Sequence, residues 1–185
     1  MFEVAEIPRK ISKQQYREEV PKLREKLLFA VKDERKRAVV IVVSGLDGAG
    51  KGETVNLINE WLDPRYLRTR SMRTPTDEEL ARPRMYRFWR ALPPKGRSAV
   101  FFGSWYSKPM ADRIAGRITD TEYDQALQRI RRFEKMLVDE GVVLLKLWFH
   151  LSKKQQKKRL KELEKDKKTR WRVSKKDWQG YESRD

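Results

Sequence analysis

The sequence predicts a three-layer α/β fold, in which a central parallel sheet is flanked by helices. Two observations lead to this prediction. Short apolar runs rich in β-branched residues alternate along the chain with longer segments of helical periodicity. The first of these runs, over 38–44, is continuous and rich in β-branched residues, which is typical of a parallel strand buried on both faces, and the run over 98–103 is also expected to be buried. The length of 185 residues suits a single domain over 1–185 with its own hydrophobic core.

The first elements are a helix and a strand. A charged amphipathic helix is expected over 12–37, where Leu23, Leu27 and Val31 stand at near-helical spacing. The continuous run over 38–44, AVVIVVS, is expected to be a central strand. A glycine-rich turn follows, and then a helix over 53–62 that Asp63-Pro64 ends.

The second half of the chain repeats the alternation of strands and helices. The apolar runs predict further strands, and the periodic segments predict helices that begin at capping residues. We expect a strand over 65–73, a helix from a capping box at Thr76 to about 92, a strand over 98–103, a helix over 121–140, a strand over 142–151, and a last long helix capped by Ser152.

The turn after the first strand has the sequence GLDGAGKG over 45–52. Between a strand and a helix, this spacing is typical of the phosphate-binding loop of P-loop proteins, and a plain connecting turn is the weaker alternative. Glycines let backbone N–H groups turn toward one point, and the helix N-terminus adds positive potential. Lys51 is expected to reach the terminal phosphates. The predicted phosphate-binding residues of the loop are Gly45, Gly48, Ala49, Gly50, Lys51 and Gly52.

An acidic residue in this loop points to a metal. The Ser or Thr that commonly follows the lysine and binds magnesium is Gly52 here, whereas the loop contains Asp47. A carboxylate among phosphate-binding amides requires a cation or a proton. Asp47 is therefore the candidate metal ligand and Mg²⁺ the expected cofactor. The alternative is an aspartate that forms the turn by bonding its own backbone.

The charge of the chain predicts an anionic partner. The formal net charge is +17, and the segments 65–97 and 152–185 contribute +7 and +8 of it. The basic residues of the first segment are nearly all arginine, whose guanidinium binds phosphate oxygens bidentately. Nucleic acid, an acidic membrane face and a phosphate polymer are the candidate partners.

Other classes are excluded by composition. The chain has no cysteine for disulfides or thiolate metal sites, and its single histidine, His150, cannot form a histidine cluster. No run of about 18 apolar residues exists, so no membrane span is expected. We expect a cytoplasmic protein.

Four further segments follow GLDGAGKG in order: RTPTDEE, RFWRALPPKG, FFGSWYSKP and TRWRVSKKDW. The series, over about 38–178, resembles the polyphosphate kinase 2 family, P-loop kinases with a basic helical lid. It is most similar to the polyphosphate:AMP phosphotransferase branch, and there to the first domain of members that fuse two domains. The resemblance implies phosphoryl transfer between inorganic polyphosphate and adenine or guanine nucleoside mono- or diphosphates, with magnesium. It also implies a homo-oligomer or a fused second domain, and a chain that is part of a longer protein.

The resemblance also assigns residues. Arg90 and Arg113 fall on phosphate-contacting arginines, which with Asp47 and Lys51 form the implied catalytic set. Arg73 belongs to the arginines that balance the phosphate charge. Three residues, Lys168, Arg170 and Arg172, fall in a lid over about 166–178 that closes over the substrates, and the nucleotide is expected near 74–76.

One departure from the resembled pattern bears on activity. Active members carry an aspartate and an arginine, in a pattern like FDRSWY, where this chain has Phe102 and Gly103. The second magnesium aspartate is thus replaced by Phe102, which leaves Asp47, or Asp112 nearby, to hold the metal. A degenerate binding domain that supports an active partner domain and an ATP-dependent nucleotide kinase stay open as alternatives. A nucleic-acid-binding module is a third alternative, although no specific nucleic acid is expected as a partner.

Overall fold

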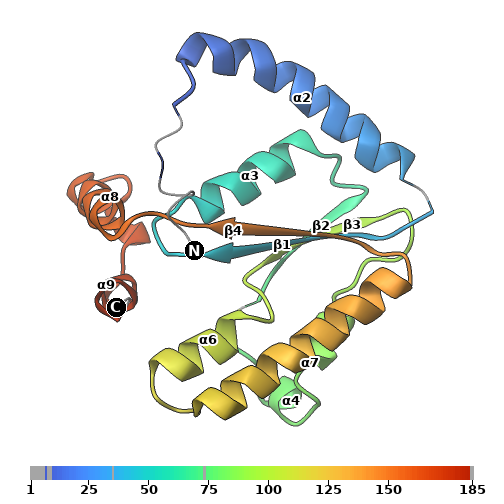
Figure 1. Ribbon diagram of the computed structural model, residues 1–185. Helices are drawn as coiled ribbons and strands as arrows, with labels where there is room; N and C mark the ends of the chain where they lie inside the picture. The colour runs from blue at the N-terminus through green and yellow to red at the C-terminus, as the bar shows by residue number, and fades with distance from the viewer. Residues whose placement is uncertain (1–6, 8–9, 35, 73, 184–185) are drawn as a thin grey trace.

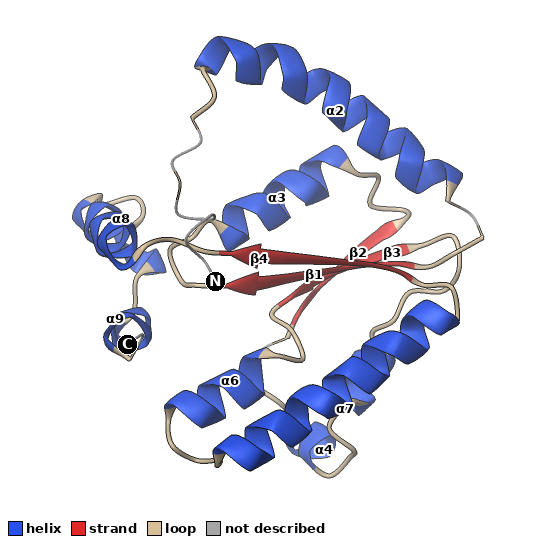
Figure 2. Ribbon diagram, in the orientation of Figure 1, coloured by secondary structure: helices blue, strands red, loops and turns tan. Residues whose placement is uncertain are grey.

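The three-layer prediction is confirmed by a computed structural model, which describes residue 7 and residues 10–34, 36–72 and 74–183. Four parallel strands form one sheet in the order β2-β3-β1-β4. Helices α2 and α3 cover one face, and α6, α7 and the short α4 lie on the other (Figures 1 and 2). The strands are β1 (Val39–Gly45), β2 (Leu67–Ser71), β3 (Ser98–Phe102) and β4 (Val143–Phe149). The helices are α2 (Lys13–Asp33), α3 (Lys51–Trp61), α4 (Asp77–Leu80), α5 (Tyr86–Trp89), α6 (Ser107–Ile114), α7 (Asp120–Asp139), α8 (Lys153–Lys165), η1 (Arg170–Arg172) and α9 (Lys175–Glu182).

Strand β1 lies inside the sheet and supplies both cores. Because successive side chains of a strand point to opposite faces, Val40 and Val42 pack toward α7, while Ile41 and Val43 pack toward α3. The pairing register places Gly45 opposite Phe149. The carboxyl ends of the strands therefore meet at one edge, where open α/β sheets bind their ligands. Helices α8 and α9 lie at this edge (Figure 1).

The core under the sheet is aromatic. Trp105 and Phe133 meet edge to face with ring centroids 5.2 Å apart. Next to them, the carboxylate of the buried Glu134 accepts hydrogen bonds from Trp105 Nε1 (2.9 Å), Tyr106 OH (2.7 Å) and Lys146 Nζ (2.8 Å). These bonds satisfy the buried carboxylate and join α7 to β4 and to the segment after β3.

Strand β4 forms one edge of the sheet. Leu145, Leu147 and Trp148 of this strand are 46%, 38% and 42% exposed. The prediction of a strand buried on both faces is confirmed for β1, and the expected burial of β3 is confirmed as well, whereas β4 is partly exposed.

The helix predicted from 76 to 92 is wrong. The capping box forms as expected between Thr76 and Glu79, but α4 is only four residues long and a second short helix, α5, begins at Tyr86. Pro83 lies between them. Proline has no N–H to donate, and its ring disfavours helical backbone in the preceding residue, which favours a break between α4 and α5 here, although α2 continues through Pro21.

Other expected boundaries need smaller corrections. Helix α2 ends at Asp33 rather than 37 and has no buried residue. Its Leu27, Leu28 and Val31 nevertheless pack against the core between the sheet and α3. Strand β2 is confined to five residues of the nine predicted. The sequence does not predict helix α6, because a segment of eight residues is too short to show helical periodicity. Helix α7 begins at Asp120, one residue before the expected start, with a capping box at its N-cap Thr119.

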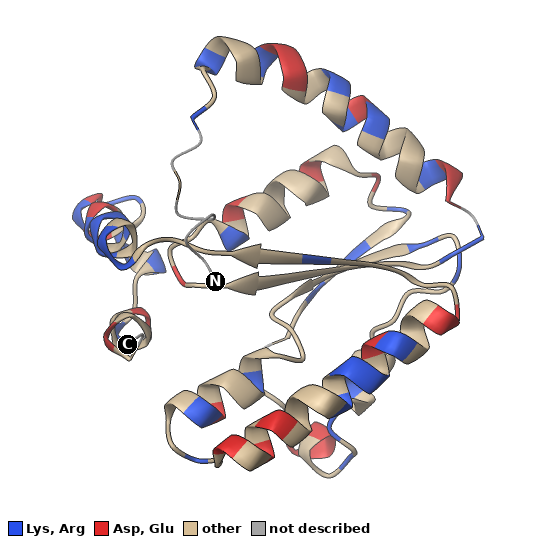
Figure 3. Cartoon of the chain, viewed as in Figure 1, with Lys and Arg blue, Asp and Glu red and all other residues tan. Residues whose placement is uncertain are grey.

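The C-terminal helices match the expected order. Helix α8 is capped by Ser152 as predicted, and the basic segment after it folds into η1 and α9. Figure 3 shows that lysine and arginine dominate α8. Over the described ranges, no helix combines the length and the apolar character that crossing a bilayer requires.

Candidate phosphate-binding site

The predicted phosphate loop connects β1 to α3. Helix α3 begins at Lys51, with Gly50 as its N-cap, so the helix N-terminus adjoins the loop. Gly45 has a φ of +124°, and a Cβ atom at this position would come within 2.1 Å of the Phe149 carbonyl oxygen. A side chain cannot be placed there. The strand-to-loop turn therefore requires glycine because β4 runs directly beside it.

The charged residues of the loop contact each other. Lys51 Nζ donates hydrogen bonds to the carbonyl oxygen of Gly45 (2.5 Å) and to Asp47 Oδ1 (2.9 Å). The Lys51 side chain is 18% exposed and that of Asp47 50% exposed. A partly buried ammonium thus lies at the base of the loop with a carboxylate beside it, as a site for an anion and a metal ion requires.

A cavity of about 540 Å³ lies over this loop. Its walls include Asp47, Lys51, Phe102, Trp171 and Arg172, which come from the loop, from the end of β3 and from η1. The structure thus brings together the loop residues with one of the three predicted lid residues. The ring of Phe102 contributes no donor atom for a metal.

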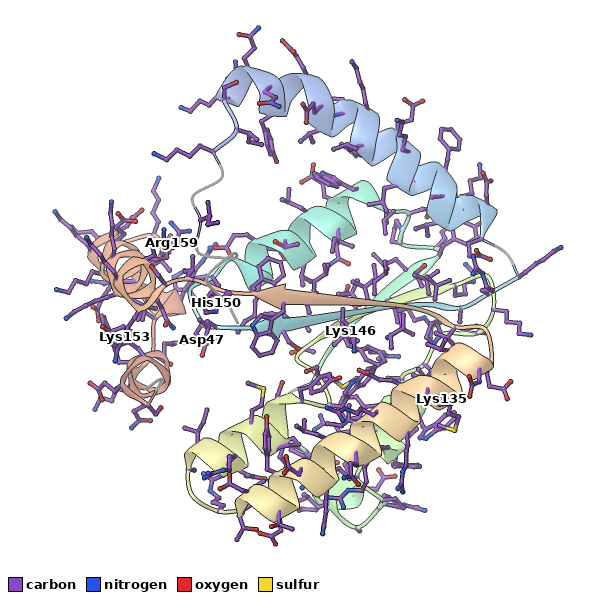
Figure 4. The ribbon with its side chains drawn as sticks, in the orientation of Figure 1. Asp47, Lys135, Lys146, His150, Lys153 and Arg159 are labelled. Atoms are coloured by element: carbon purple, nitrogen blue, oxygen red, sulfur yellow. The ribbon has the colours of Figure 1, made fainter. Side chains whose placement is uncertain are left out.

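Arg172, one of the predicted lid residues, is held in this cavity by a carboxylate. Arg172 Nη1 lies 3.0 Å from Glu53 Oε1, and Arg159 Nη2 of α8 lies 4.0 Å from the same oxygen. Glu53 is in the first turn of α3, so one acidic residue next to the loop connects it to both α8 and η1. Figure 4 shows Asp47 beside α8, from which Lys153 and Arg159 project.

The other predicted site residues lie outside the loop cavity. Arg90 faces Glu78 of α4, with 3.6 Å between Nη1 and Oε1. Arg113 Nε donates to Asp120 Oδ1 at 2.7 Å. Lys168 and Arg170 do not line this cavity, and Arg73 lies outside the described residues. Their predicted roles stay predictions.

Asp112 is engaged elsewhere. Its side chain is 6% exposed, and its two oxygens bind Lys108 Nζ (2.7 Å) and Arg117 Nη1 (3.0 Å). Burial acts to raise the pKa of Asp112, but the hydrogen bonds from Lys108 and Arg117 outweigh it and hold the pKa below its ordinary value. The carboxylate fixes two cations and does not adjoin the cavity that Asp47 lines. Within the described chain, no three His, Cys, Asp or Glu residues cluster as a metal centre.

A second, basic cavity lies where the resemblance implies the nucleotide, near 74–76, but the residues that form its other walls do not follow from the sequence. It has a volume of about 480 Å³ and lies between the α4–α5 segment and α6, near Thr74 and Pro75. It adjoins the carboxyl end of β1 through Ser44, whose hydroxyl donates to Ser104 Oγ at 2.6 Å in the cavity wall. The arginine-rich composition of 65–97 was the available indication, but the pattern did not show which cations converge. These cations are Arg82, Arg84, Arg87, Lys108 and Arg117.

Comparisons with known proteins agree on one family. The family model described as Polyphosphate kinase 2 (PPK2) matches residues 10–185. The chain is 51% identical over 185 residues to a polyphosphate:AMP phosphotransferase of Pseudomonas aeruginosa, covering 98% of this chain and 37% of that protein. It is 35% identical to a GDP-polyphosphate phosphotransferase of Mycobacterium tuberculosis, over 77% of this chain and 50% of the other.

Solved structures show the same likeness. The crystal structure of a Pseudomonas aeruginosa protein described as a polyphosphate kinase 2 superposes with a TM-score of 0.82 at 52% identity, over 86% of this chain and 36% of that one. Polyphosphate kinase 2 of Arthrobacter aurescens gives a TM-score of 0.75 at 28% identity, over 86% and 59%. The chain spans little more than a third of the Pseudomonas relatives that it matches.

Proposed function

Since this chain belongs to the polyphosphate kinase 2 family, we propose that it is a phosphotransferase domain for inorganic polyphosphate and a nucleoside mono- or diphosphate. The observation that carries the proposal is the cavity over the phosphate loop, which is lined by Asp47 and Lys51 of the loop and by Arg172 of η1. The names of the relatives add the substrate classes, because they specify polyphosphate with AMP or GDP.

We assign the loop cavity to the phosphate chain. A phosphate group that enters the cavity would replace Asp47 as the partner of the Lys51 ammonium. It would also accept hydrogen bonds from backbone N–H groups of the loop and of the start of α3. Arg172 would leave Glu53 and bind the chain when the lid closes, and Lys168 and Arg170 would add charge at the rim. The polymer repeats one anionic unit, so a basic surface without base-reading groups is sufficient.

The second cavity suits the nucleotide. Five cations line it, which favours the phosphate groups of a nucleotide, and Pro75 and Phe88 give it an apolar side for the rest of the molecule. The Ser44–Ser104 contact makes it a neighbour of the loop, as transfer between two substrates requires. Arg90 and Arg113 remain proposed phosphate contacts, and each would first have to leave its carboxylate.

The donor set fits one magnesium ion that binds together with phosphate. Mg²⁺ keeps several waters and usually takes one or two carboxylates plus substrate phosphates. Asp47 is half exposed and lines the cavity, so it can supply one carboxylate. When bound, the ion would neutralise charge on the transferring phosphoryl group. Lys51 would hold the same group, and the lid would exclude water.

A second candidate is a binding domain without activity of its own. Phe102 favours this candidate, because its ring lines the loop cavity where the resembled pattern places a carboxylate. Such a domain would bind polyphosphate or nucleotide for an active domain, either a fused one or a second copy. In the relatives, about two thirds of the chain lies outside the match, which leaves room for further domains there. The lack of cysteine suits the reducing cytoplasm, where we propose that the domain acts.

The test is an assay of the purified chain with magnesium, long-chain polyphosphate and either AMP or ADP, without ATP. Formation of ADP or ATP that Lys51→Ala abolishes supports the phosphotransferase and excludes a kinase that needs ATP as donor. Binding without product supports the second candidate. In that case, Phe102→Asp is the informative variant, because a restored carboxylate should produce measurable turnover if the metal site alone was lacking. If the chain neither binds polyphosphate or nucleotide nor forms product, both candidates are contradicted.

A further inference from the structure

A buried glutamine holds the phosphate loop from the far side. Gln156 of α8 is 1% exposed, and its Nε2 donates a hydrogen bond to the carbonyl oxygen of Asp47 at 3.0 Å. The two residues are 109 positions apart in the sequence, so this contact exists only in the folded chain. Leu160, one turn later on the same helix and also 1% exposed, lies against the next loop residue, at 3.3 Å from a Cβ built on Gly48.

The contact falls at the point where the loop has the greatest freedom. Gly45, Gly48 and Gly50 all have positive φ, and glycine-rich backbone is intrinsically mobile. A loop of this kind must be fixed by its surroundings if its N–H groups and Asp47 are to meet a phosphate in a constant geometry. The side chain of Asp47 is itself directed by Lys51, which leaves the peptide group of Asp47 to be fixed by α8.

The ordinary explanation is that Gln156 is a core polar group satisfied by a convenient carbonyl. Two features favour a specific role. The acceptor belongs to the residue that we propose as the metal ligand, and the partner helix leads directly into η1 with its lid arginine. Loss of a group that orients a metal ligand typically lowers metal affinity or activity by roughly ten- to a hundredfold.

We infer that Gln156 is a positioning residue, which acts through the Asp47 peptide to hold the carboxylate and the loop amides in the geometry that binds a magnesium–phosphate chain. The inference rests on the proposed function for its ligand. The order of the loop in the protein alone can be tested independently of that function.

The experiment compares Gln156→Met with Gln155→Met. Both remove a glutamine amide from the first turns of α8, but the side chain of Gln155 is exposed and accepts its hydrogen bond from the Ser152 N–H in the capping box. Amide hydrogen exchange of residues 45–52 is measured without ligand, and binding of tripolyphosphate is titrated with and without magnesium. We expect Gln156→Met to accelerate loop exchange about fivefold, the equivalent of one hydrogen bond. We also expect it to weaken binding about tenfold with magnesium and less without it, since Asp47 acts on the metal.

The outcomes separate the two proposals. Unchanged loop exchange in Gln156→Met, or equal acceleration in Gln155→Met, would overturn the positioning role. Accelerated exchange in a protein whose wild type fails to bind tripolyphosphate would support the role in the loop and refute the proposed function. If Gln156→Met does not fold, Gln156→Asn takes its place, because it keeps the amide but is one methylene too short to reach the carbonyl; the same results are expected.

Discussion

The two cavities at the carboxyl ends of the strands are built in different ways. The loop cavity is made largely of one local stretch, the loop and helix α3 from Asp47 to Asn59, and its main cation, Lys51, is four residues from its acid. The second cavity draws its five cations from a span of thirty-six residues, which includes the turn between α4 and α5, α5 itself, α6 and the segment after α6. The first site therefore depends on backbone conformation, and the second depends on how side chains from separate elements converge.

The carboxylates of the two cavities also differ in their bonding. In the loop cavity, Asp47 and Glu53 are about half exposed, and each holds a cation that a phosphate could take over. In the second cavity, Asp112 is almost fully buried and fixes Lys108 and Arg117 in place. Ligand binding should thus exchange ion pairs at the loop but leave those of Asp112 intact. The following experiments test this difference.

The largest expected effect is on stability, at Gly45, where the loop backbone lies against the backbone of Phe149. Gly45→Ala should lower the free energy of unfolding by about 4 kcal/mol or more, because its Cβ collides with the Phe149 carbonyl oxygen at a positive φ. Thermal and urea unfolding measure the change. Gly52→Ala is the matched control for stability, since a Cβ there meets nothing within 4 Å. A stable Gly45→Ala protein would contradict the tight strand-to-loop turn.

Loss of the loop ammonium should separate the two ligands. Lys51→Ala is expected to weaken tripolyphosphate binding about a hundredfold, because a charge-assisted contact in a partly buried site is lost. AMP binding at the second cavity should change less than about twofold. Calorimetric titration gives both affinities. Lys135→Ala, on the exposed face of α7, serves as the charge-matched control. An equal loss for both ligands would mean that they share one site.

The reciprocal variant is Arg84→Met. It removes one of several cations from the second cavity, so AMP affinity should fall about tenfold while tripolyphosphate affinity stays constant. The same titrations apply, again beside Lys135→Ala. Should Arg84→Met weaken only tripolyphosphate, the assignment of the two cavities must be exchanged.

The smallest effect concerns Asp112 and is dependent on pH. Its pKa is lowered in the folded protein, so its stabilisation is present above the unfolded pKa, about 3.9, and is lost as pH falls through the folded value. Asp112→Asn should therefore cost about 1 kcal/mol at pH 7 and progressively less below pH 4. Urea unfolding across this range measures the difference. Asp139→Asn, an exposed partner of Lys135, should show little at any pH.

Local sequence was sufficient for one cavity and insufficient for the other. GLDGAGKG located the loop, and the capping boxes at Thr76 and Ser152 located helix starts, because each is a short-range pattern with a fixed geometry. Pro83 was overlooked as a breaker, which merged α4 with α5 and hid the turn that lines the second cavity. Convergence of Arg84 with Arg117 and contact of Gln156 with Asp47 arise from tertiary packing, which no local pattern encodes.

The net charge of the chain also opposes association between copies through the sheet edge formed by β4. Unpaired strand edges with apolar side chains, such as Leu145 and Trp148 on β4, promote edge-to-edge association between copies. Mutual repulsion at a net charge of +17 opposes this association. A long polyanion neutralises that repulsion and gathers several copies on one molecule. Light scattering should therefore increase when polyphosphate is added at low salt, and added salt should reverse the increase.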